Sequence, residues 1–543
     1  MTIILSHFLL FLFICYSNGL IFLKKINHLT NANNFYEISI IGLAVTILAA
    51  QIINFFYPLN NLLIYLNIIL IIYFIIRNKK TFLNNLKISY VIFIPILIIS
   101  ILNIYGSKFS DDINHYHYGS ILNTDNHNYI WGLSHLHNVY GTSSIWLIGH
   151  SYFNFEEYRL QDIHILNGII LFLITCLFAS EIGLVNKKKN NYSIIIFSIL
   201  IFILLKYTRL KEFGIDRPAF LFFYFLIYYY LKNFLYNKNI VKFNDFLILC
   251  LICFLIIFIK IIFLSILIIP FYLMVKYRKK LFKINFKSAL IFFIGLSFFL
   301  KNILISGCLI FPIDFLCFES ISWNNLKGVK EITIMMDTIN KSWFLYSGDL
   351  TQSQYLNNFN WISTWINRNF TELLEFLITV ILCILITISC FKKKKFLKKI
   401  ENVKYKEFQL VLLLLILFSL AIFFQAPIIR MFHHILILIM VLFLFTLIKE
   451  KKIVLKNNLI LFFLITAIFF NGYKNILRIK KEHFINDPLR AVSAYIWKPH
   501  EKKIDNFSYF QGWFGQSPIG NENLKGLSHK KKFIFDIIYK KKL

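Results

Sequence analysis

The residues best suited to chemistry stand in one short segment, Phe109-Ser110-Asp111-Asp112-Ile113-Asn114-His115-Tyr116-His117-Tyr118, directly after an apolar run. If 111–122 form a helix, Asp111 faces His115 and Asp112 faces Tyr116, because side chains four residues apart share a face. A carboxylate beside an apolar wall can act as a general base, or it can hold a divalent cation next to a phosphate. We predict Asp112 and Asp111 as catalytic residues, with Tyr116 and His117 beside them. The alternative is a solvated helix cap.

Histidines are concentrated in and just after the same segment. Seven of the 14 in the chain occupy positions 115, 117, 127, 135, 137, 150 and 164. Two His-x-His pairs suggest a Zn or Cu site, since imidazole is a ready ligand for both metals. Alternate residues share a face only in a strand, however, and no thiolate cluster accompanies them. We therefore favour polar lining of a substrate groove, with His137 as a substrate-binding residue. We predict no resident metal, although the acids could hold a divalent cation.

Two tryptophans follow within a stretch rich in Gly and hydroxyl side chains. Trp131 opens the run Trp-Gly-Leu-Ser-His-Leu-His, and Trp146 closes the run Gly-Thr-Ser-Ser-Ile-Trp that begins at Gly141. Such a segment suits a re-entrant or interfacial position with the indole rings at headgroup level. Stacking of a carbohydrate on Trp131 or Trp146 is an equal alternative. Trp146 is therefore also a candidate substrate-binding residue.

Three isolated basic residues stand at the ends of apolar runs. Lys260 divides a long apolar run, Arg217 precedes Pro218, and Arg430 follows Pro427. Because a Lys at the bilayer centre costs about 3 kcal/mol, we expect Lys260 at the tip of a short hairpin. Such cations can simply extend to water. If two or more converge beside Asp112, they would bind a lipid-linked phosphate, with Arg bidentate and Lys as a point charge.

The elements that must position these residues are apolar helices. Of the 543 residues, 58% are hydrophobic, and the mean hydropathy is +0.65, which excludes a soluble globular enzyme and a disordered chain. At roughly 20 residues per crossing, this supply fits on the order of 14 spans. The sequence therefore predicts an all-α polytopic membrane protein with about 14 transmembrane helices. The expected spans are 3–23, 37–56, 62–76, 88–105, 163–185, 192–205, 218–231, 246–259, 261–275, 289–305, 373–391, 408–424, 432–448 and 459–473.

The formal net charge of +31 is first an indication of topology, and we expect no nucleic-acid partner. If both termini are external, the lysine-rich loops fall on the inner side, and the first outer segment is rich in acids. The predicted parts are N-terminal spans 1–105, a first external loop 106–162 with the candidate active site, central spans 163–305, a second external loop 306–371, C-terminal spans 372–473 and an external segment 474–543. The first span is retained, because it lacks a charged n-region and a cleavage site.

The eight cysteines do not form a disulfide framework. Cys308 and Cys317 flank Pro312 in an external loop and could form a disulfide. The spacing of Cys250 and Cys253 is typical of a redox motif, but the pair lies in an apolar helix. No P-loop, dinucleotide fingerprint or Gly-x-Ser-x-Gly elbow appears, so ATP-driven and Ser-hydrolase chemistry are not expected.

With acids in its first large external loop, many spans with short hairpins and an external C-terminal region, the chain resembles the GT-C class of integral-membrane glycosyltransferases. That resemblance implies polyprenyl-phosphate-linked sugar donors. It further implies that Asp112 or Asp111 activates the acceptor or helps hold a metal, and that Lys260 and Arg430 contact the donor phosphate.

The chain also resembles an uncharacterised family of bacterial multi-pass membrane proteins. The matching pieces are Asp112 with Tyr116-His117; Gly132-Leu133, Leu136-His137, Gly141, Ser143-Ser144 and Trp146; Ser306-Gly307, Phe311-Pro312 and Trp323; Ala426-Pro427 and Arg430; and Gly512-Trp513 with Ser517-Pro518. This family implies no reaction.

The function predicted from these residues is transfer of a sugar from a polyprenyl-phosphate donor to an envelope glycan or lipid acceptor on the outer face of a bacterial inner membrane. The partners would be the lipid-linked donor and membrane lipids. The alternative is a polysaccharide flippase, polymerase or other transporter. A transporter needs polar groups near the bilayer midplane, and the expected spans have few.

Overall fold

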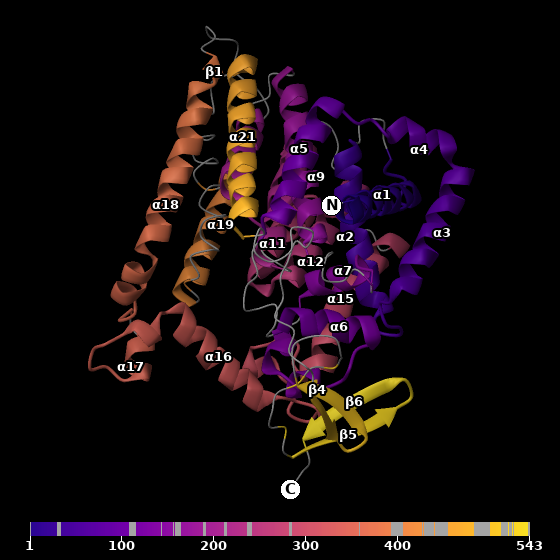
Figure 1. Ribbon diagram of the computed structural model, residues 1–543, viewed down its shortest axis with the longest axis vertical. Helices are drawn as coiled ribbons and strands as arrows, with labels where there is room; N and C mark the ends of the chain where they lie inside the picture. The colour runs from indigo at the N-terminus through magenta and orange to yellow at the C-terminus, as the bar shows by residue number, and fades with distance from the viewer. Residues whose placement is uncertain are drawn as a thin grey trace.

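The computed structural model describes residues 2–29, 34–107, 116–142, 144–155, 157, 164–187, 192–210, 214–235, 242–281, 285–357, 359–392, 405–425, 427, 439, 454–482, 500–511, 518, 520, 524 and 526–540. Most of them are helical (Figure 1). Six described helices are long and apolar enough to cross a membrane: α1 (Thr2–Lys25), α2 (Phe35–Ile53), α9 (Ile165–Lys187), α15 (Phe286–Ser306), α18 (Ile362–Ser389) and α21 (Asn457–Glu482). The length and hydropathy of these helices indicate that the chain is a membrane protein.

The expected count of about 14 spans is not supported. A seventh span is formed only if α3 (Asn61–Arg77) and α4 (Lys79–Asn85), which meet at 98°, are one broken helix. The shorter apolar helices are α5 (Tyr90–Tyr105), α10 (Tyr192–Lys206), α12 (Phe243–Ile259), the run Ile261–Lys276 formed by η6 (Ile261–Leu267) and α13 (Ile268–Lys276), and Gln409–Ala421 within α19 (Tyr405–Gln425). At about 1.5 Å per residue, a helix of about 16 residues extends roughly 24 Å, short of a hydrocarbon core of about 30 Å. An apolar run in the sequence therefore predicts a buried helix, but a run of this length does not by itself predict a helix that crosses the whole membrane.

Short helices and strands make up the segments between the long helices. The short helices are α6 (Tyr118–Asn126), η2 (Leu133–His135), η3 (Asn138–Thr142), α7 (Ile145–Tyr152), α11 (Asp216–Tyr230), the π-helix η5 (Leu231–Leu235), α14 (Arg278–Leu281), η7 (Asp314–Leu316), α16 (Leu326–Asn340), η8 (Trp343–Leu345) and α17 (Gln352–Leu356). The strands form three antiparallel pairs: β1 (Phe391–Lys392) with β2 (Val454–Leu455), β3 (His500–Ile504) with β4 (Phe507–Gln511), and β5 (Leu527–Lys532) with β6 (Phe535–Lys540). The described tail thus adds strands to the expected all-α fold.

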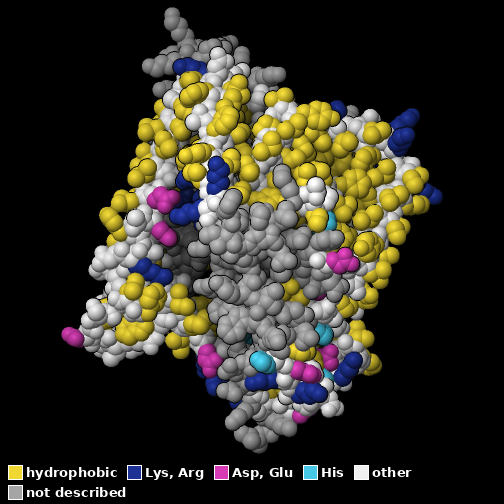
Figure 2. Space-filling model, in the orientation of Figure 1, with side chains coloured by type: hydrophobic (Ala, Val, Ile, Leu, Met, Phe, Trp, Pro, Cys, Tyr) yellow, Lys and Arg dark blue, Asp and Glu magenta, His cyan; other side chains and the backbone are white. Residues whose placement is uncertain are grey.

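Helix α9 forms the centre of the bundle. It packs against α1, α2, α5, α10 and α11, and its apolar window is 89% buried. Helices α18 and α21 lie at the periphery, where only 22% of each window is buried. Figure 2 shows hydrophobic side chains over much of the visible flank, as expected for helices whose outer surfaces face lipid.

Two glycines permit the close contact between α1 and α2. A Cβ on Gly42 would lie 1.8 Å from the backbone oxygen of Cys15, and one on Gly19 would lie 2.0 Å from that of Ile38. Small residues of this kind let membrane helices pack backbone to backbone. No other side chain fits at these positions without separating the pair.

The bundle has two ends of different character. Figure 1 places β1 and α4 at one end, and α16, α17 and the C-terminal hairpins at the other. We call the first end the lysine face, because it carries Lys24, Lys25, Arg77, Lys79 and Lys80. We call the second end the loop face. Its second loop contains the disulfide between Cys308 and Cys317 that the sequence suggested.

Candidate functional site

The predicted hairpin tip, Lys260, lies at the loop face. Helix α12 ends at Ile259, the backbone of Lys260 is extended, and η6 then packs against α12 on its return. The Lys260 ammonium forms an ion pair with the carboxylate of Asp216, in the first turn of α11. One cation of this region is therefore matched by an acid from a neighbouring helix.

Arginines from three parts of the chain converge beside this ion pair. Burial is the main cause that lowers the pKa of the Arg217 guanidinium, and the positive charges of Arg478 and Arg209 lower it further. The Arg217 guanidinium lies 5.5 Å from the centre of the Tyr207 ring. Its buried Nη1 donates to no acceptor among the described residues. The cation group, which we define as Arg209, Arg217, Lys260 and Arg478, thus carries more positive charge than Asp216 can neutralise.

An asparagine network holds Arg478 in this group. The Nδ2 of Asn475 donates to the Oδ1 of Asn103 at 2.9 Å and to the Oδ1 of Asn471 at 3.0 Å, and all three side chains are buried. The Nδ2 of Asn471 donates to the Leu204 carbonyl at 2.9 Å. Arg478 in turn donates to the carbonyl of Thr208. These bonds connect α5, α10 and α21, so the position of Arg478 is set by buried partners.

A second group, which we call the histidine group, consists of His117, His150 and His164. Burial is the main cause that holds the pKa of His150 well below its usual range, and the nearby His164 and His117 imidazoles act in the same direction. All three histidines are buried. They come from the turn before α6, from α7 and from the turn before α9, so the first loop and the bundle enclose them together.

Other polar groups from the same elements surround the histidine group. The Trp146 indole donates to the Oδ1 of Asn167 at 2.7 Å and lies edge-on to the His150 ring. The Ser151 hydroxyl donates to the carboxylate of Asp125. Because Trp146 is fully buried, its ring is part of the wall between α7 and α9.

Two contacts connect the surroundings of the histidine group to the helices of the cation group. The Ser144 hydroxyl donates to the Ile259 carbonyl at 2.7 Å, one residue before Lys260. The Trp146 ring contacts that of Phe222 in α11. The Phe258 ring of α12 separately stacks on that of Phe298 in α15, with centroids 4.2 Å apart. Both groups therefore belong to one end of the bundle.

Lys301 adds a further cation to this region. It lies three residues beyond Phe298 in α15 and is fully buried, with its ammonium 4.9 Å from the centre of the Phe298 ring. A lysine inside a spanning helix marks a functional position in most membrane proteins. In the sequence Lys301 stands as the single charge within the apolar run 289–305, a signal that was not among the predicted site residues.

The structure describes six of the nine predicted site residues. Lys260 and Arg217 belong to the cation group. His117 belongs to the histidine group, and Trp146 contacts that group through His150. Tyr116 stacks edge-on against His117 with ring centroids 4.3 Å apart. His137 stands apart from both groups in the loop, where its Nδ1 accepts from the Val139 amide. Asp111, Asp112 and Arg430 lie outside the described residues, and so does the predicted convergence of cations beside Asp112.

No group of three or more His, Cys, Asp or Glu side chains that could hold a metal occurs among the described residues. His135 and His137 lie in and after a 3₁₀ turn, so their rings do not take the common face that a strand would give them. Burial lowers the pKa of His135 to about 4, and a hydrogen bond with the Trp323 backbone partly opposes this shift.

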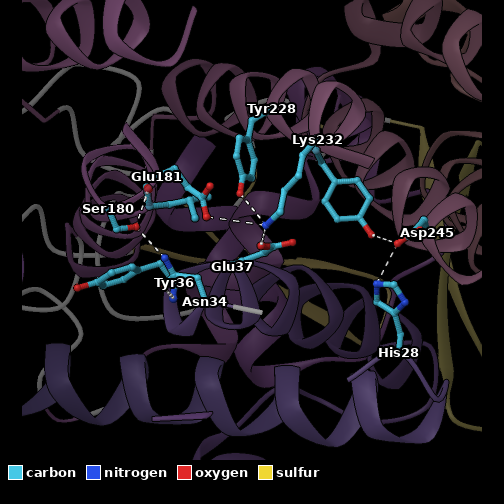
Figure 3. Close-up of polar contacts among 11 residues, drawn as sticks. His28, Asn34, Tyr36, Glu37, Ser180, Glu181, Tyr228, Lys232 and Asp245 are labelled. Atoms are coloured by element: carbon cyan, nitrogen blue, oxygen red, sulfur yellow. Dashed lines mark hydrogen bonds and ion pairs between the residues drawn. The ribbon is translucent and has the colours of Figure 1, made fainter. Parts of the chain in front are cut away.

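A polar cluster that the sequence did not predict lies near the lysine face. The Lys232 ammonium lies 2.6 Å from the Oε2 of Glu37 and 3.8 Å from the Oε1 of Glu181, and it also donates to the Tyr228 hydroxyl at 2.9 Å (Figure 3). Nearby, Asp245 is 3.0 Å from the Nε2 of His28 and accepts from Tyr229 at 3.3 Å. Both glutamates are buried. We call these residues the carboxylate cluster.

The carboxylate cluster joins the ends of several helices. Glu37 is in α2, Glu181 in α9, Lys232 in the π-turn η5 and Asp245 in α12. In α12, for example, Asp245 lies in the first turn, whereas Lys260 follows the last turn at the loop face. The cluster is thus separate from the loop-face groups.

One family model matches residues 1–437 and describes a domain of unknown function, DUF8201. The chain belongs to this family. The DUF8201 match includes the histidine group, the carboxylate cluster and Arg217, whereas Arg478 and the tail hairpins lie beyond it. No curated protein and no solved structure matches the chain.

Proposed function

We propose that this DUF8201 protein is a membrane glycosyltransferase that moves a sugar from a polyprenyl-phosphate donor to an envelope acceptor at the loop face. The observation that carries the proposal is the convergence of Arg217, Arg478 and Arg209 beside the Lys260 ion pair. An arrangement of several half-buried cations with one acid suits a phosphate, and arginine can bind phosphate with two parallel hydrogen bonds.

A small, open and mostly apolar hollow lies near the cation group. It lies between the η6–α13 run and α19, where it is lined by Ser265, Ile268, Ile269, Val411, Leu414 and Leu415. Ser265 follows Lys260 by five residues in a 3₁₀ helix, which corresponds to roughly 10 Å. A polyprenyl chain in this hollow would therefore bring its phosphate near Lys260.

In the proposed reaction the acceptor hydroxyl attacks the anomeric carbon as the bond from that carbon to the phosphate oxygen breaks. Asp112 or Asp111 would take the hydroxyl proton, and the departing phosphate would gain negative charge. Cations held in place before the reaction stabilise such charge without reorganisation. Arg217 and Arg478 are assigned this role, and the histidine group would line the sugar site.

Transfer of a radiolabelled sugar from a polyprenyl phosphate by the purified full chain tests this assignment. We expect Asp112→Asn to reduce transfer by about a hundredfold or more, as for loss of a general base. Arg217→Gln should reduce both donor binding and transfer. Unchanged transfer by Asp112→Asn, at normal protein level, would contradict the assigned base.

The carboxylate cluster favours a second candidate, a polysaccharide flippase or other transporter. Ionisable side chains buried within spanning helices often mark pathways for ions or substrates, and Glu37 and Glu181 are such side chains. Movement of a lipid-linked glycan across proteoliposomes without any transfer of sugar, lost in Glu181→Gln, would support this candidate over the first.

A further inference from the structure

The β5–β6 hairpin carries an apolar turn at the end of a basic strand. Phe533 is 87% exposed and Ile534 is 51% exposed, and they join β5 to β6. The three residues before them, Lys530, Lys531 and Lys532, are exposed as well. The one acid of the hairpin, Asp536, lies 2.9 Å from His529. The turn is therefore both apolar and positively charged.

Backbone hydrogen bonds fix this hairpin to the bundle. The Trp131 amide donates to the Asp536 carbonyl, and the Ile538 amide donates to the Trp131 carbonyl, both at 2.9 Å. The Gly132 amide donates to the carbonyl of Leu304, in the last turn of α15. A Cβ on Gly132 would lie 2.1 Å from the Ile538 oxygen, so a larger residue would push the hairpin away. The hairpin thus lies level with the end of a candidate span.

The turn also lies near the end of α2. The Nδ2 of Asn128 donates to the Ile534 carbonyl at 3.1 Å, and the next residue, Tyr129, donates its amide to the Asn54 carbonyl at 3.2 Å. Asn54 directly follows α2, and the nearby Phe56 is 69% exposed. An exposed aromatic side chain therefore follows α2 at the same end of the bundle as the turn.

We propose that the Phe533–Ile534 turn inserts into the headgroup region of the bilayer and that Lys530, Lys531 and Lys532 bind anionic phospholipid phosphates. Aromatic side chains prefer the membrane interface, and lysines extend to phosphates while their stems remain in apolar surroundings. Each basic residue near an anionic surface strengthens binding about fivefold. Figure 2 shows basic side chains over the region of the β5–β6 hairpin. The hairpin would hold the Trp131 segment at the membrane surface.

The test uses the full chain in vesicles with equal parts of phosphatidylcholine and anionic phosphatidylglycerol. A spin label is attached to Phe533→Cys and, as a matched control, to Asn506→Cys, an exposed turn residue of the β3–β4 hairpin. We expect the label at 533 to collide with oxygen dissolved in lipid and to be protected from a water-soluble nickel chelate. The label at 506 should be open to nickel.

A triple variant, Lys530→Gln, Lys531→Gln and Lys532→Gln, tests the charge contribution in the Phe533→Cys background. Protection from nickel should decrease in this variant, and it should also decrease in vesicles of phosphatidylcholine alone. Equal exposure of labels 533 and 506 to nickel would overturn the proposal. Shielding of label 533 from both reagents would also overturn it, because a protein surface would then cover the turn.

Discussion

Lys260, at the turn after α12, forms an ion pair with Asp216 in the first turn of α11, so opposite charges join the loop-face ends of two helices. Arg217 is the next residue along the chain; Asp216 acts on its guanidinium too, but so do the positive charges of Arg478 and Arg209, and Arg217 forms no ion pair with Asp216 among the described contacts. Asp216 therefore compensates Lys260 more than it compensates the arginines. We therefore expect Arg217 to contribute more than Lys260 to the binding of a donor phosphate.

Arg217→Gln should weaken binding of a polyprenyl phosphate about tenfold, because a hydrogen bond to a charged group contributes roughly 1.5 kcal/mol or more. Lys260→Gln should weaken it less, since Asp216 already shares that charge. Titration of the lipid into nanodiscs that contain the full chain measures both affinities.

Arg77→Gln is the matched control, because Arg77 ends α3 at the opposite face. It should leave the affinity unchanged. Equal losses in Arg77→Gln and Arg217→Gln would show that overall charge, and not the cation group, attracts the lipid.

Lys232→Met should destabilise the protein by about 3 kcal/mol, because it leaves the buried Glu37 and Glu181 without their shared cation. Thermal unfolding in detergent measures the change. Adding Glu37→Gln to Lys232→Met should restore part of the loss, since one buried charge is then removed. A double variant no more stable than the single one would exclude a charge effect.

Gly42→Leu should separate α1 from α2 and lower the unfolding temperature, because overpacking of a tight contact costs about 1–3 kcal/mol. Gly183→Leu is the control, as a Cβ there would meet nothing within 4 Å. Similar unfolding temperatures for both variants would show that the glycine contact is not tight in the folded protein.

Acid should destabilise the loop face through His135. Its pKa is about 4 in the folded protein and about 6.5 in the unfolded chain, so the unfolded state binds more protons between these values. The stabilisation is complete above pH 6.5 and decreases as the pH falls towards 4. At pH 5 the loss is roughly 2 kcal/mol. Unfolding of the wild type and of His135→Gln at pH 7 and pH 5 should show a smaller decrease in the variant.

The sequence predicted a helical membrane protein and several of its local features. Lys260 was expected at a reversal of the chain, because a lysine inside an apolar run is costly, and the helix does end there. Cys308 and Cys317 form the suggested disulfide. These features depend on local composition, which a single sequence displays directly.

Features that depend on tertiary packing were missed. Arg478 had been assigned to the tail after residue 473, but α21 continues to Glu482 and brings it to Thr208. Glu37 and Glu181 appeared only as single charges at the edges of apolar runs. Nothing in their spacing indicates that both face Lys232, since three separate helices bring them together.

Mass spectrometry of lipids that co-purify with the full chain tests the central proposal most directly, with the wild type compared with Arg217→Gln combined with Arg478→Gln. The proposal predicts a polyprenyl phosphate or its glycosylated form with the wild type, and about a hundredfold less with the variant if the two losses add. Equal amounts in both samples, or ordinary phospholipids alone with the wild type, would contradict it.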